Sequence, residues 1–97
     1  MLTIAIKEPG KAWEKREVED TLKTYQDIVG GPIEHFHRSN NGVEYFCNEE
    51  GLLRDLEPNV VVCGQTIVGT IFAVRSNEEG EFESLRDEDL LRILGNR

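Results

Sequence analysis

Two histidines and a cysteine are the residues of this sequence whose types and spacing most readily suggest chemistry. His35 and His37 stand two positions apart in an expected strand, so alternation would direct both to one face, with Cys47 on the next strand. Imidazole and thiolate bind zinc, but a structural site takes four ligands, and no second pair with ligand spacing exists. We therefore expect a solvent-facing polar stripe with Phe36 turned inward, and no metal.

Catalysis by Cys47 would need an activating base and a site that stabilises an oxyanion. No acyl-transfer motif surrounds this cysteine, and the glycine pair in "VGGP" lacks the spacing of a phosphate-binding loop. We expect no catalytic residues, no cofactor and no enzymatic activity.

The segment from residue 78 to residue 89 is the most acidic part of the chain, with Arg86 as its one base. A solvated loop and helix start would account for it, whereas a calcium loop would need alternating ligands that are absent. The sharper hypothesis is a rigid negative ridge that binds a basic groove of a partner in the place of phosphates. Its predicted partner-binding residues are Glu78, Glu79, Glu81, Glu83, Asp87, Glu88 and Asp89.

A second acidic stretch, "CNEEGLLRDLEPN", reads as a structured crossing between two strands. Asn48 and Gly51 supply turn chemistry, and Pro58 with Asn59 opens the next strand. We expect its three leucines, Leu52, Leu53 and Leu56, to enter the core. Any binding role would then fall to a secondary acidic rim of Glu49, Glu50 and Asp55.

Length and charge narrow the function classes. Ninety-seven residues predict a single domain spanning 1–97. The net charge of −8 disfavours direct binding of nucleic acid, which needs a basic footprint, and of anionic membranes. No stretch is long and apolar enough to span a membrane, and the start does not resemble a signal peptide. We expect two free thiols, Cys47 and Cys63, in a reducing cytoplasm.

Local patterns predict an α+β domain: a mainly antiparallel sheet of about five to six strands with two helices, one after the first strands and one C-terminal, packed on one face. Asp20 is expected to cap the first helix and Gly30 to end it. A capping box of Ser84 and Asp87 would open the second, with Leu90, Leu91 and Leu94 inward. The expected strands are 2–7, 12–18, 33–39, 43–48, 60–63 and 66–74, and the helices 21–29 and 87–94.

Two further details follow from the same patterns. Asn40–Gly42 is expected to turn one hairpin, and Gly64–Gln65 a second. The run 66–74 is apolar almost throughout, so it should be the central strand, with a bulge or close backbone approach at Gly69.

The segments "IKEPGK", "TLKTYQDIVGGPIE", "CNEEGLLRDLEPN" and "TIVGTIFAV" together resemble a small domain-of-unknown-function family, encoded by phages, plasmids and other mobile elements of mostly Gram-positive bacteria. The likeness covers Ile4 to about Leu94. The family's usual "LPPN" stands here as "LEPN", with Glu57, and Arg86 stands where Ser or Thr commonly opens the last helix. The family carries no catalytic residues to transfer.

The resemblance implies an accessory protein of a phage or mobile element that binds a host or element-encoded protein in the bacterial cytoplasm and modulates host defence by blocking a basic groove. The alternatives are a structural interaction module without a defence role and a binder of a small nucleotide-like ligand between protomers. In the ligand reading Gly30, Gly31, Gly69, His35 and His37 would line the pocket, and Arg38, Arg54 and Arg75 would supply positive charge. A homodimer through a sheet edge stays open.

Overall fold

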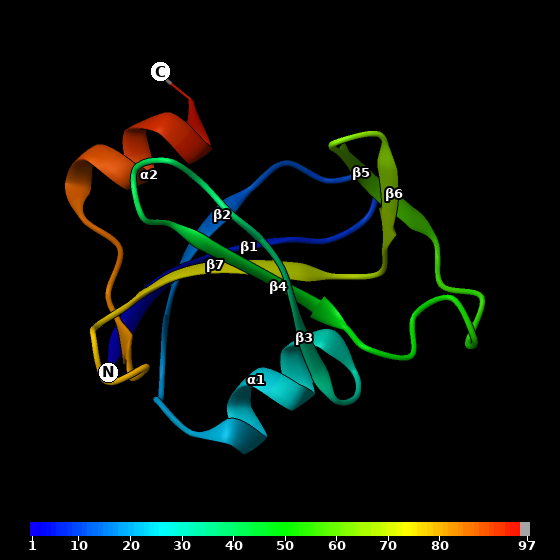
Figure 1. Cartoon of the computed structure of the whole chain (residues 1–97), viewed down its shortest axis with the longest axis horizontal. Helices are drawn as coiled ribbons and strands as arrows, with labels where there is room; N and C mark the ends of the chain where they lie inside the picture. Colours follow the sequence, from blue (N-terminus) through cyan, green and yellow to red (C-terminus); the bar gives the residue numbers. More distant parts are fainter. Residues whose placement is uncertain (96–97) are drawn as a thin grey trace.

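Eight strands and two helices make up residues 1–95, the part of the chain that the computed structural model describes (Figure 1). In chain order they are β1 (Leu2–Lys7), β2 (Glu14–Val18), α1 (Leu22–Val29), β3 (Ile33–Arg38), β4 (Glu44–Asn48), β5 (Pro58–Val62), β6 (Gln65–Val68), β7 (Ile71–Ser76), β8 (Phe82–Glu83) and α2 (Asp87–Leu94). The predicted α+β class is confirmed, with one helix after the first strands and one at the C-terminal end.

The main sheet is antiparallel and is built around β7. Its strand order is β2-β1-β7-β4-β3, and β8 also pairs with β7. The first four residues of β7, Ile71 to Val74, are all buried. The nearly continuous apolar run therefore predicted the central strand correctly, because only a strand covered on both faces tolerates such a run.

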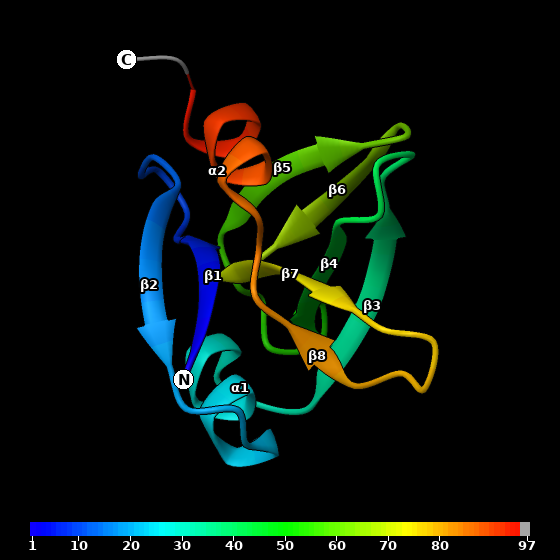
Figure 2. The same cartoon turned by 90° about the vertical axis from the view of Figure 1, so that its left-hand side faces the viewer.

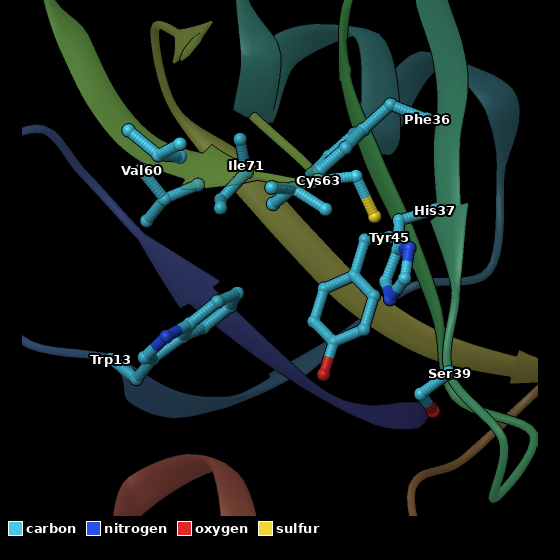
Figure 3. Close-up of a pocket in the computed structure, with 10 residues that line it drawn as sticks. Trp13, Phe36, His37, Ser39, Tyr45, Val60, Cys63 and Ile71 are labelled. Carbon is cyan, nitrogen blue, oxygen red and sulfur yellow. The ribbon is translucent and has the colours of Figure 1, made fainter. Parts of the chain in front are cut away.

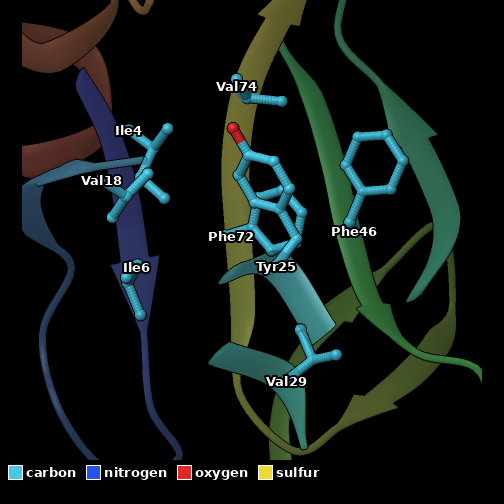
Figure 4. Close-up of a cluster of buried hydrophobic side chains, with 8 residues drawn as sticks. All are labelled: Ile4, Ile6, Val18, Tyr25, Val29, Phe46, Phe72 and Val74. Carbon is cyan, nitrogen blue, oxygen red and sulfur yellow. The ribbon is translucent and has the colours of Figure 1, made fainter. Parts of the chain in front are cut away.

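The two faces of the sheet are covered differently. Ile4 and Phe72 pack with Tyr25 and Val29 of α1, so this side is the α1 face; Figure 4 shows the aromatic rings of Tyr25, Phe72 and Phe46 together. Tyr25 and Phe46 each stack on Phe72 with ring centroids 5.1 Å apart.

The alternate residues of the same strands point to the other side. Ala5 and Ala73 pack there with Leu85, Leu90 and Ile93, so α2 covers the opposite face, the α2 face. The expectation that both helices share one face was wrong. The small side chains of Ala5 and Ala73 leave room for α2 on this side.

The predicted strand 66–74 is divided at Gly69 into β6 and β7. Gly69 has a φ of +79°, and a Cβ placed on it would lie 2.7 Å from Cδ1 of Leu56. The close approach expected at Gly69 is present, and it ends one strand and begins another. β6 therefore leaves the main sheet and forms a separate two-stranded sheet with β5.

The β5–β6 hairpin stands on the same face of the sheet as α2 (Figure 2). Its turn is Cys63–Gly64, one residue before the predicted turn, and Val62 pairs with Gln65. Both turn residues have positive φ, 51° and 79°, as a two-residue type I′ turn requires. Val60 and Ile67 seat the hairpin against Cys47 and Ile71.

The helix α1 begins one residue later than predicted. Thr21 is its N-cap, and its hydroxyl accepts a hydrogen bond from the Thr24 amide at 3.1 Å. Asp20, the predicted cap, instead accepts one from the Tyr25 hydroxyl at 2.8 Å. Gly30 ends the helix in the left-handed conformation, as predicted. Leu22 is 60% exposed, so the buried stripe of α1 is narrower than expected.

The predicted capping box of α2 is shifted by two residues. Arg86 is the N-cap, and its amide donates to the Asp89 carboxylate at 2.8 Å. Ser84 lies before the helix, and its hydroxyl accepts a hydrogen bond from the Thr3 amide at 2.9 Å. Leu90 and Leu94 are half-buried, but Leu91 is 61% exposed and was wrongly expected to face inward.

Candidate functional site

The acidic segment forms one continuous strip along a side of the molecule. It runs from the loop after β7 through β8 to the first turn of α2, across the side that faces the viewer in Figure 2. We call the exposed acids of this strip the acidic ridge: Glu78, Glu79, Glu81, Glu83, Asp87 and Glu88.

The loop of the acidic ridge is held in shape by Asn77. Its side-chain oxygen accepts hydrogen bonds from the amides of Glu79 and Glu81, at 2.9 and 3.0 Å. Its backbone amide donates to the Glu81 carbonyl oxygen at 2.9 Å. Glu78 and Glu79 are both exposed on this ordered loop, so their carboxylates are accessible from solvent.

Asp89 does not belong to the ridge. It is 0% exposed, and its carboxylate accepts two hydrogen bonds from the Arg75 guanidinium, at 2.6 and 2.9 Å. The hydrogen bond from Arg75, helped by the Arg86 amide, holds the pKa of the Asp89 carboxyl below its usual value. The expectation that Asp89 lies on the surface was wrong, because its carboxylate is buried and paired with Arg75 between β7 and α2.

The secondary acidic rim lies on a loop whose leucines are placed differently from the prediction. Leu52 and Leu53 are 77% and 89% exposed, and only Leu56 is half-buried. Glu49 is exposed, and the Glu50 carboxylate is paired with Arg54 at 3.0 Å. The loop thus presents two leucines to solvent together with Glu49 and Asp55, where the sequence had suggested acids alone.

His35 and His37 lie on opposite faces of the sheet. A β-bulge at Phe36 shifts the register, so that His35 is opposite Phe46 and His37 is opposite Tyr45. The Nε2 atom of His35 lies 3.1 Å from Oε1 of Glu44. The ring of His37 instead packs near the ring of Tyr45, with centroids 5.7 Å apart. Sequence alternation could not place the pair, because the bulge adds one residue to β3.

Among residues 1–95, no three side chains of His, Cys, Asp or Glu gather in a group that could hold a metal ion. Cys47 and Cys63 are both free, as expected, with Cys47 buried and Cys63 exposed. Burial and the nearby Glu34 charge raise the pKa of the Cys47 thiol to about 11, which keeps it protonated and a weak nucleophile at neutral pH.

Two of the three arginines considered for an anionic ligand are engaged by carboxylates of the chain. Arg75 binds Asp89, and Arg54 binds Glu50 and also donates to the Gly30 carbonyl oxygen at 3.1 Å. The positive charge of Arg75 and Arg54 is therefore partly neutralised by these carboxylates, which makes both side chains poorer ligands for an anion.

Two grooves flank the β5–β6 hairpin, and Phe36 lines both. The first, which we call the aromatic groove, has a volume of about 450 Å³. Figure 3 shows Trp13 and Tyr45 on one side of it and Val60 and Cys63 on the other. The rings of Trp13 and Tyr45 meet edge to face with centroids 6.0 Å apart. Its lining is Trp13, Phe36, His37, Ser39, Tyr45, Val60, Val61, Val62, Cys63 and Ile71.

The second groove, which we call the leucine groove, lies on the β6 side of the hairpin and has a volume of about 520 Å³. It is bounded by β3, β4, β6 and the loop after β4. Its lining is Glu34, His35, Phe36, Cys47, Asn48, Glu49, Gly51, Leu52, Leu53, Gln65, Thr66, Ile67 and Val68.

Sequence reasoning found neither groove, because both depend on where the hairpin stands. One signal was present: Trp13 is the one tryptophan of the chain and sits in a polar stretch, "GKAWEK". A large aromatic residue in such a setting indicates a packed or binding position outside the main core pattern.

Fold and surface together define an α+β domain with an acidic ridge on one side and two grooves beside the β5–β6 hairpin. A family model described as "Domain of unknown function (DUF3846)" matches residues 2–95, so the chain belongs to this family. No curated protein and no solved structure matches it. No helix within residues 1–95 is long and apolar enough to cross a membrane.

Proposed function

We propose that this chain is a non-enzymatic protein-binding domain whose acidic ridge binds a basic surface of a partner protein. The observation that carries the proposal is the ridge itself: six exposed acids follow one side of the molecule, and Arg86 is the one base between them in sequence. Opposite potentials accelerate and orient such encounters.

Rigidity supports the proposal. The Arg75–Asp89 pair ties α2 to β7, and Asn77 ties the loop, so both ends of the ridge are anchored to the fold. A surface whose charges are already positioned loses less conformational entropy on binding than a mobile acidic tail.

The family resemblance adds the finer part of the proposal. It suggests an accessory protein of a phage or mobile element that occupies the nucleic-acid groove of a host defence protein. Neither the ridge nor the fold by itself points to that partner.

The test compares two variants of equal charge. E78Q/E79Q/E81Q/E83Q removes four carboxylates from the ridge, and E14Q/E17Q/E19Q/D27N removes four exposed ones from β2, the connection that follows it and α1. Each protein is used to capture partners from a bacterial lysate at low and moderate salt. A nucleic-acid-binding protein retained by wild type and by the second variant, and lost with the first, is the expected result. If both variants lose the partner equally, the binding depends on net negative charge and not on the acidic ridge, which would contradict the proposal.

The aromatic groove favours a second candidate, the binding of a small planar ligand. Trp13 and Tyr45 offer ring faces, and none of the described residues that line the groove is an arginine or lysine, so an uncharged ring fits better than a phosphate. Trp13 is the one tryptophan, so its fluorescence reports on the groove directly. We expect nucleosides, but not nucleotides, to quench the Trp13 fluorescence in a saturable way. Emission that neither nucleosides nor nucleotides change would reject this candidate.

A further inference from the structure

Leu52 and Leu53 form the most exposed pair of adjacent large apolar side chains within residues 1–95. They do not belong to a frayed segment. Inside their loop the Leu56 amide donates to the Gly51 carbonyl oxygen at 3.1 Å, and the Arg54 amide donates to the Glu50 carbonyl oxygen at 3.0 Å. These hydrogen bonds fix the loop in a conformation in which both leucine side chains remain exposed to solvent.

The base of this loop is fixed to the rest of the fold on two sides. The Asn48 side chain donates to the Val29 carbonyl oxygen at 3.1 Å and accepts from the Glu50 amide at 2.7 Å. On the hairpin side, the Gly69 amide donates to the Glu57 carbonyl oxygen at 2.7 Å. The leucines are thus presented at one border of the leucine groove by a pre-ordered loop.

The remaining walls of the groove combine apolar and acidic surface. Phe36 and Ile67 supply apolar surface, whereas the exposed carboxylates of Glu34 and Glu49 line the same groove. The charge of Glu34 acts on a neighbouring residue of the groove, because it contributes, after burial, to the raised pKa of the Cys47 thiol. No lysine or arginine lines this groove within the described residues.

We propose that the leucine groove docks a cationic amphipathic segment of a partner protein, with apolar side chains against Leu52, Leu53 and Phe36 and lysine or arginine side chains at Glu34 and Glu49. Charge complementarity selects this occupant, because an acidic border opposes an acidic segment and an anionic lipid surface alike. The inference rests on the proposed function: it names a contact that confers specificity, while the acidic ridge supplies attraction at longer range.

The experiment maps the binding of two synthetic peptides on the full chain by amide chemical shifts. The first is a peptide of about fifteen residues with leucine at helical spacing and lysine between. The second has serine in place of each leucine. The first peptide should shift amides of the Glu49–Arg54 loop and of β6, whereas the serine peptide should shift only amides of the acidic ridge.

Matched variants separate the leucine groove from exposed leucine in general. L52S/L53S removes the proposed contact, and L22S/L91S removes two exposed leucines from α1 and α2. L52S/L53S is expected to weaken the leucine peptide at least about fivefold, roughly 1 kcal/mol, and L22S/L91S to leave its affinity unchanged. E34Q/E49Q should weaken it as well and make its binding less sensitive to salt.

The outcomes separate this proposal from the proposed function. Shifts confined to the acidic ridge with both peptides overturn the docking site and leave the proposed function standing. Shifts confined to the leucine groove support the docking site and count against the ridge, and no binding of either peptide at low salt overturns both. Concentration-dependent line broadening of the free protein that L52S/L53S removes would assign the groove to a second copy of this chain, and would also overturn the proposal.

Discussion

At the scale of single residues, Asp89 shows how an acid within an acidic segment can serve the fold. Of the ion pairs within residues 1–95, the Arg75–Asp89 pair is the one in which both side chains are largely withdrawn from solvent, at 12% and 0% exposure. Arg75 also donates to the Asn41 carbonyl oxygen at 2.7 Å, so one guanidinium connects β7, α2 and the β3–β4 turn. Among residues 1–95, the exposed acids Asp87 and Glu88 beside it have no comparably buried partner.

Asp89→Asn is expected to destabilise the protein by about 3 kcal/mol, because removal of one partner leaves the other charge poorly compensated. The measurement is urea denaturation at neutral pH. Asp87→Asn is the matched control: this residue is exposed in the same helical turn, so its replacement should change the free energy of unfolding by less than about 0.5 kcal/mol. Equal effects of the two substitutions would contradict the structural role of Asp89.

The same pair predicts a dependence on pH. The pKa of Asp89 is lowered in the folded state, so its contribution to stability is complete above the unfolded-state pKa of about 4 and is lost as the pH falls towards the lower folded-state pKa. Wild type should therefore lose more stability than Asp89→Asn on acidification below about pH 4. The difference between their denaturation midpoints, measured across that range, should shrink as the pH falls; a constant difference would exclude the ion pair as its origin.

At the scale of elements, Gly69 is the residue at which the hairpin leaves the main sheet. Its positive φ disfavours any side chain, and an added Cβ would also meet Leu56. Gly80 has a similar φ of +82° with no atom within 4 Å of such a Cβ, so it isolates the backbone cost alone.

Gly80→Ala is expected to cost about 1 kcal/mol, the usual penalty for a side chain in the left-handed region. Gly69→Ala should cost about 1 kcal/mol more, because Leu56 must move as well. The combined variant G69A/L56A should then be less destabilised than the sum of its parts, since truncation of Leu56 removes the collision. Urea denaturation of wild type, Gly80→Ala, Gly69→Ala, Leu56→Ala and G69A/L56A measures these free energies; strict additivity of the two single substitutions at Gly69 and Leu56 would show that Leu56 does not limit the turn.

Sequence patterns predicted those elements whose signals are local. β1, α1 with its Gly30 end, and α2 followed from alternation, helical spacing and turn residues. The exact form of the bulge at Phe36 and of the break at Gly69 could not be predicted from local patterns. The bulge depends on how β3 pairs with β4, and the break depends on the contact with Leu56, thirteen positions earlier in the chain. The acidic ridge was found for the same local reason, whereas the leucine groove needed the hairpin's position.

At the scale of the whole molecule, the distribution of charge along the acidic ridge works against stability. Carboxylates on β2 and α1 have basic neighbours: Glu14 pairs with Arg16, and Asp27 with Lys23 at 3.0 Å. Across the ridge loop, Glu78, Glu79 and Glu81 follow one another with no base between them. Like charges held close together repel, and in a chain of net charge −8 this repulsion opposes the compact state.

Neutralising the ridge should therefore stabilise the protein at low salt. The variant E78Q/E79Q/E81Q/E83Q is expected to gain about 0.5 kcal/mol at about 0.01 M ionic strength and to lose that gain near 1 M, where charges are screened beyond about 3 Å. The control E14Q/E17Q/E19Q/D27N removes as many charges but also breaks favourable pairs, so it should gain less. Thermal denaturation across a salt series measures both. If the two variants gain equally, net charge alone is responsible; if only the first gains, the acidic ridge carries a local electrostatic strain that binding to a basic partner would relieve.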